Sequence, residues 1–72
     1  MLVDISFKDI FLVSIDKKNV DILYENGSSV TLVFNSSGEA ENFYHRNEFI
    51  DSSLGHYKAS IKEVEVKHIK VY

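Results

Sequence analysis

Residues 10–34, IFLVSIDKKNVDILYENGSSVTLVF, decide the fold of this chain. Their apolar side chains recur at every second position, which is the period of a β-strand. The stretch therefore predicts three consecutive antiparallel strands. With residues 16–19 as the first connection, three cross-strand pairs share one face: Ile15 with Val20, Val13 with Ile22 and Phe11 with Tyr24.

The second connection contains Asn26-Gly27, a strong signal for a two-residue hairpin. A two-residue loop would, however, pair Ile22 with a threonine and mix the two faces, because a slip of one residue inverts every side chain. A three-residue loop over 25–27 restores agreement and pairs Ile22 with Val30. Gly27 then takes the left-handed position that closes a type I turn with a bulge.

The first fifteen residues keep one phase, with apolar side chains at odd positions from Val3 to Ile15 and Asp9 as the single polar interruption. This segment is either one long strand that bends at Lys8-Asp9 or two short strands joined there. The unbroken phase favours a bent strand that serves two edges of a curled sheet.

After Phe34 the period changes from two residues to three or four, which predicts an amphipathic helix. Ser36 is the expected N-cap and Glu39 completes a capping box. The helix should end near Ser52-Ser53, with Gly55 as the break. Phe49 lies at the margin of its apolar stripe, which contains Ala40, Phe43, Tyr44, Asn47, Ile50 and Leu54.

The last segment predicts one strand over about 61–71 that returns to pair with the N-terminal strand. Its apolar phase changes near Lys67-His68, which indicates a bulge or a change of partner. The expected fold is α+β, in one compact domain over residues 1–72. It has a single antiparallel sheet of four to five strands in the order β-β-β-β-α-β. The helix should cover the face that carries Phe11, Val13, Ile15, Val20, Ile22, Tyr24, Val30, Leu32 and Phe34.

The composition excludes several classes of function. The net charge is −3, and there is no cysteine for a disulfide framework or a thiolate-bound metal. His45, His56 and His68 do not have zinc-site spacing, and we expect no metal or cofactor. Neither a nucleophile elbow nor a phosphate-binding glycine loop occurs, so we expect no catalysis. The N-terminus carries no signal-peptide or transmembrane pattern, and the expected location is the cytoplasm.

Two similar triplets, Tyr44-His45-Arg46 and His56-Tyr57-Lys58, combine an aromatic side chain with a cation, as nucleic-acid contacts do. Lys67 and Lys70 extend this set toward the C-terminus. A nucleic-acid-binding module is therefore the alternative function. The acidic residues around the triplets would repel phosphate, and the isoelectric point is near 5.5.

The function that the sequence favours is a protein-interaction module. Ile10, Leu12, Leu23 and Val33 are expected on the sheet face away from the helix, with Leu12 directly opposite Leu23. Such a patch suits a small protein that inhibits or regulates a partner protein by occupying its surface, or one that forms a homodimer. Phages and mobile elements encode many inhibitors of this kind, anti-CRISPR proteins included. No motif identifies the partner.

Overall fold

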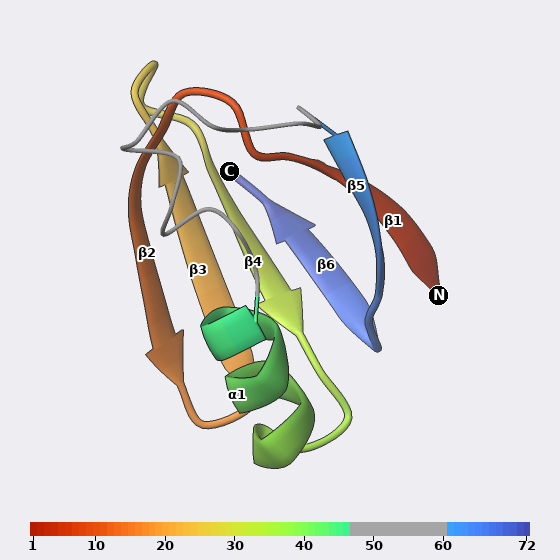
Figure 1. The fold of residues 1–72 in the computed structure, drawn as a ribbon. Helices are drawn as coiled ribbons and strands as arrows, with labels where there is room; N and C mark the ends of the chain where they lie inside the picture. Colours follow the sequence, from red (N-terminus) through yellow and green to blue (C-terminus); the bar gives the residue numbers. More distant parts are fainter. Residues whose placement is uncertain (47–60) are drawn as a thin grey trace.

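The computed structural model describes residues 1–46 and 61–72 (Figure 1), and it confirms the α+β class with antiparallel strands. The expected single sheet is instead two sheets, one of β2-β3-β4-β6 and one of β1-β5. The helix follows the fourth strand, as predicted. The elements are β1 (Leu2–Ser6), β2 (Ile10–Asp16), β3 (Asn19–Tyr24), β4 (Ser29–Val33), α1 (Ser37–Arg46), β5 (Ile61–Glu65) and β6 (His68–Val71).

The N-terminal segment forms two short strands, and the favoured single bent strand is wrong. Asp9 has a φ of 60°, a left-handed conformation that a continuous strand does not contain. β1 therefore leaves to pair with β5, while β2 pairs with β3. Before Asp9 the predicted apolar phase is kept, because Ile5 and Phe7 are buried at odd positions. It returns at Val13 and Ile15, which pack against the core.

The pairing of β2 with β3 confirms the predicted partners of Ile15 and Val13. A β-bulge then interrupts the register between Ile10 and Leu12, so that Ile10 lies opposite Tyr24. Phe11, predicted to face Tyr24 in the core, is 69% exposed. That prediction is wrong because a bulge adds one residue to a strand and changes the face of the side chains beyond it.

The hairpin between β3 and β4 has the predicted three-residue loop. Gly27 has a φ of 90°, and its N–H donates to the carbonyl of Tyr24 at 3.0 Å. The Tyr24 N–H donates to the Ser28 carbonyl at 2.8 Å and closes the loop. The predicted pairs of Ile22 with Val30 and of Val20 with Leu32 are both present.

The C-terminal segment changes partner, which is one of the two alternatives that its change of phase predicted. β5 pairs with β1 and β6 pairs with β4, so the expected single strand over 61–71 is divided. The change occurs between two consecutive residues. The Val66 N–H donates to the Met1 carbonyl at 2.9 Å, and the Lys67 N–H donates to the Val33 carbonyl at 2.8 Å.

The core lies between the two sheets and under α1, which contacts β2 and β3. Ser36 caps the helix, since its Oγ accepts from the Glu39 N–H at 3.2 Å. Every residue of 11–34 predicted on the covered face, Phe11 excepted, is buried or packs against the core. The predicted helical residues after Arg46 (Asn47, Phe49, Ile50 and Leu54) and the predicted helix end at Ser52, Ser53 and Gly55 lie outside the described residues.

Phe43 docks the helix. It is 8% exposed, and its ring centroid lies 5.3 Å from that of Phe34 and 6.3 Å from that of Phe7. These three aromatic rings join α1 to the connections that follow β4 and β1. The helix is thereby fixed to both halves of the molecule.

We expect Gly27→Ala to lower the free energy of unfolding by about 1 kcal/mol, because an L-residue is strained at this φ. An added Cβ would have no neighbour within 4 Å, so the cost is one of backbone conformation alone. Gly38→Ala is the matched control. Its Cβ would lie an ordinary 3.8 Å from Ser36 Oγ, and in a helix the change should be neutral or stabilising. Urea denaturation measures both, and equal midpoints for the two variants would contradict the loop assignment.

We expect Phe43→Ala to lower the free energy of unfolding by about 3–5 kcal/mol, because it leaves a cavity between the rings. This is a large share of the total stability of a small domain, roughly 5 kcal/mol or little more. Asn42→Ala, at the preceding exposed position of α1, is the control and should stay within about 0.5 kcal/mol of the wild type. Retention of a dispersed amide NMR spectrum by Phe43→Ala with an unchanged midpoint would argue against this packing.

Candidate functional site

The outer face of the four-stranded sheet is the face away from α1. Cross-strand pairing arranges its residues in rows, since directly opposed residues point to the same side. The Thr31 hydroxyl donates to Asp21 Oδ1 within the middle row. The three rows are Leu12, Leu23 and Ser29; Ser14, Asp21, Thr31 and Lys70; and Asp16, Asn19, Val33 and His68.

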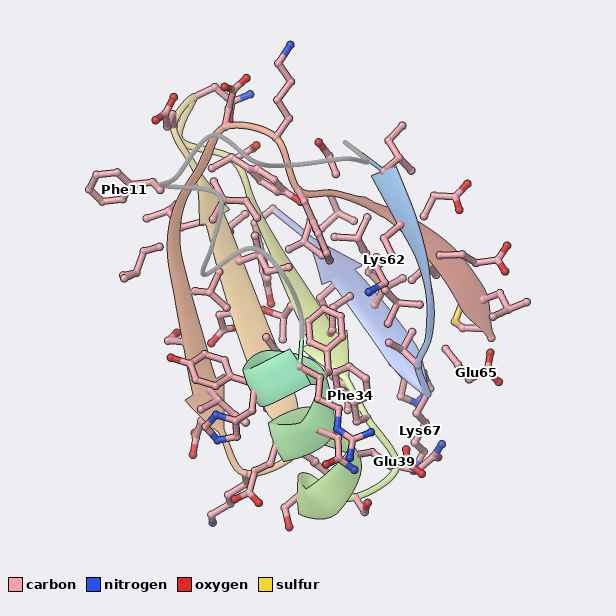
Figure 2. All side chains as sticks on the ribbon, in the orientation of Figure 1. Phe11, Phe34, Glu39, Lys62, Glu65 and Lys67 are labelled. Atoms are coloured by element: carbon pink, nitrogen blue, oxygen red, sulfur yellow. The ribbon has the colours of Figure 1, made fainter. Side chains whose placement is uncertain are left out.

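The most apolar part of this surface lies at the edge strand β2. Leu12 is 56% exposed and lies directly opposite the half-buried Leu23, as predicted. The bulge adds the exposed Phe11 next to them, and Figure 2 shows its ring directed away from the body of the molecule. Phe11, Leu12 and Leu23 together form the β2 patch.

The structure separates the four residues that the sequence grouped as a partner-binding site. Ile10 is half-buried and packs against the core, so its predicted place on the outer face is wrong. The bulge explains this, because it shifts Ile10 to the inner phase. Val33 is paired with Asn19, four residues from Leu23 along β3 and about 13 Å away. A polar row lies between them, so only Leu12 and Leu23 come together.

Phe11 is the residue that sequence reasoning missed. Residues 10–13 are apolar in both phases, so their sequence does not say which side chains face inward. The available signal was Asp9, a polar residue in the inward phase just before the bulge. In the structure Asp9 has a positive φ, and the β-bulge that changes which side chains face inward follows directly after it.

The residues predicted for nucleic-acid contact lie on different sides of the sheet. Lys70 is paired with Thr31 on the outer face, whereas Tyr44 and Arg46 belong to α1 over the inner face. Tyr44 is half-buried against the core, and its ring makes an edge contact with His45 at 5.3 Å between centroids. Lys67 lies in the link from β5 to β6. His56, Tyr57 and Lys58 lie outside the described residues.

A second surface feature is a groove of about 700 Å³ between the two sheets. β1 and the following turn form one wall, and β6 and the β3–β4 hairpin form the other. The described residues that line it combine apolar side chains with three acids and one lysine. The lining residues are Asp4, Ile5, Ser6, Lys8, Asp9, Tyr24, Glu25, Asn26, Ser28, Val30, Ile69 and Val71.

Tyr24 crosses one end of this groove and connects the two sheets. Its hydroxyl donates to the Ser6 carbonyl at 2.7 Å. Partial burial raises the pKa of the Tyr24 hydroxyl above its ordinary value of 10.0, because removal from water disfavours the phenolate. The neutral, hydrogen-bonded form is therefore the one that holds β3 against β1.

Within residues 1–46 and 61–72, no three His, Asp or Glu side chains come together as a metal site. The same residues contain no helix of the length and apolar character that crossing a bilayer requires. No family model, curated protein or solved structure matches this chain.

We expect Tyr24→Phe to lower the free energy of unfolding by about 0.5–1.5 kcal/mol at neutral pH, through the lost hydrogen bond. Because the folded state raises the Tyr24 pKa, the wild-type advantage should be complete below pH 10.0 and should decline as the pH rises through the folded pKa. Urea denaturation of both proteins between about pH 7 and pH 11 measures the difference. A difference that stays constant over this range would contradict the role of the neutral hydroxyl.

Proposed function

We propose that this chain is a small non-catalytic protein-interaction module that inhibits or regulates a partner protein by occupying its surface. The β2 patch is the proposed docking surface, and the cytoplasm is the proposed location. One observation carries the proposal: beside the β-bulge, Phe11 and Leu12 are exposed to solvent on β2, a strand at the edge of its sheet among the described residues. Phenylalanine and leucine side chains are more often buried in folded proteins.

The size of the patch is consistent with a contact dominated by a few side chains. Complete burial of a Phe or Leu side chain contributes about 1.5–3 kcal/mol. A standard interface buries about 800 Å² per partner, about one sixth of the 4940 Å² surface of this chain. Binding energy at such interfaces is concentrated in a small number of central residues. Phe11 and Leu12 are the best candidates for that centre.

The surroundings of the patch favour a protein partner over nucleic acid. Ser14, Asp21 and Ser29 are its neighbours on the outer face. Hydroxyl groups and one carboxylate offer hydrogen bonds to a protein surface, whereas a phosphate backbone needs cations. Among the described residues no strand pairs with the outer edge of β2, and the backbone of a partner could pair there.

We expect Leu12→Lys and Phe11→Lys each to abolish capture of the partner from an extract of the organism that encodes this protein. A lysine at either exposed position can reach water, so the fold should remain intact by circular dichroism and amide NMR. Leu2→Lys is the matched control, since Leu2 is 62% exposed on β1 and lies outside the β2 patch. It should capture the same protein as the wild type.

Self-association provides the second readout. Light scattering after gel filtration shows whether the wild type is a dimer and whether Leu12→Lys is a monomer, which would make a second copy the partner. Undiminished capture by both patch variants, or its loss only in Leu2→Lys, would place the binding surface elsewhere.

A further inference from the structure

We propose that the groove between β1 and β6 binds an extended, positively charged segment of a partner protein, which adds as a strand to the edge of β6 with which no described strand pairs. This site uses residues separate from the β2 patch. The proposal rests on three features of the groove: backbone groups on its walls with which no described strand pairs, apolar side chains beneath them, and three carboxylates against one lysine among the described lining residues.

The edge of β6 presents backbone groups toward the groove. Tyr72 and Ser29 exchange both of their N–H to carbonyl hydrogen bonds, at 2.9 and 3.2 Å. Hydrogen-bonded pairs alternate along an antiparallel ladder, so Lys70 and Thr31 form the next such pair. The N–H and carbonyl groups of Ile69 and Val71 therefore point away from β4. Among the described residues no strand pairs with that edge, and both residues line the groove.

The opposite wall of the groove, formed by β1, also presents backbone groups toward the groove. Met1 and Val66 exchange hydrogen bonds at 2.7 and 2.9 Å, so the alternating pattern pairs Val3 with Val64 through the next two bonds. The backbone groups of Asp4 therefore point away from β5, and Asp4 lines the groove. The groove is thus bounded by two strand edges, which are templates for the backbone of an added chain.

The apolar side chains of the groove suit alternate residues of an added strand. Val71 is 73% exposed although it shares a face with Val30, and Ile69 packs against the core beside it. In an added strand, every second side chain would lie on this same face. The volume of about 700 Å³ is within the range of sites that enclose a ligand.

The charge at the rim indicates the chemistry of the ligand. Asp4, Asp9 and Glu25 line the groove, and Lys8 is the one lysine among its described lining residues. Asp4 also lies directly opposite Glu63, in a pair without ladder hydrogen bonds, where side chains approach most closely. Like charges in that position destabilise a sheet. Lysine or arginine side chains of a bound strand would offset this repulsion, so we commit to a cationic peptide partner.

The test begins with a display library of random twelve-residue peptides selected against the full chain. We expect the enriched peptides to alternate apolar residues with lysine or arginine. An enriched peptide, made synthetically, is then added to the isotope-labelled protein. The amide hydrogens of Ile69 and Val71 should exchange rapidly in the free protein and become protected in the complex. Those of Lys70 and Tyr72, which are bonded to β4, should change much less.

Substitutions distinguish the contribution of backbone hydrogen bonds to peptide binding from the contribution of charge. Val71→Pro removes an N–H that points into the groove and leaves the bonds to β4, as proline is tolerated at a free sheet edge. It should bind the selected peptide about three- to tenfold more weakly than Val71→Ala, which keeps that N–H. Asp4→Asn and Asp9→Asn should each raise the Kd about two- to fivefold, as loss of an exposed ion pair does. Leu12→Lys should leave the Kd unchanged.

Three results would overturn the proposal. The first is a library that yields no binder, or yields acidic or non-alternating sequences. The second is protection of amides along β2 in place of Ile69 and Val71. The third is equal affinity of Val71→Pro and Val71→Ala, since strand addition needs the backbone group that only the proline removes. Because Leu12→Lys affects only the β2 patch, failure of this proposal and failure of the proposed function are distinguishable.

Discussion

The structure depends on two consecutive backbone hydrogen bonds that go to different sheets. The Val66 N–H donates to the carbonyl of Met1, which directly precedes β1. The Lys67 N–H donates to the carbonyl of Val33, the last residue of β4. A single C-terminal segment thereby completes both sheets and closes the core from two sides. One continuous strand that paired with β1 along one edge and with β4 along the other would join them in a single sheet. The change of partner also leaves β1 and β6 unpaired with each other, and their edges bound the groove.

The division into two sheets has an energetic consequence for so short a chain. A domain of this size buries only about 60% of the surface of its unfolded chain, and this one has no disulfide. Few residues are completely buried, and the largest of them are Ile22, Leu32, Val20 and Val66. The aromatic contacts of Phe43 supplement this core by joining the helix to both halves. Stability therefore rests on a small number of contacts that a single substitution can remove.

Both proposed surfaces arise where a regular strand pattern is interrupted. The bulge in β2 turns an apolar run partly outward and exposes Phe11. The change of partner after β5 opens the groove beside β6. Free strand edges carry a risk of unspecific pairing, which proteins reduce with charges, bulges and short strands. Here β2 has a bulge and β6 has only four residues, so each edge offers only a short regular segment for pairing.

The sequence by itself determined the elements whose apolar pattern has one possible phase. The pairs of Val13 with Ile22 and of Val20 with Leu32, the loop that ends at Gly27 and the Ser36 cap all follow from local patterns. These features depend on neighbouring residues, whose period and turn chemistry are visible in the sequence. The change of phase near Lys67 indicated either a bulge or a change of partner, and it did not say which strands are joined.

Only the tertiary structure decided the features that depend on distant segments. Residues 10–13 are apolar in both phases, so the choice between Ile10 and Phe11 for the interior rests on packing against the other elements. The division into two sheets rests on β5 and β6, which lie more than twenty residues from β4 in the sequence. No local pattern encodes which edge such a strand joins. For that reason the groove, which lies between β1, β6 and the β3–β4 hairpin, could not be predicted.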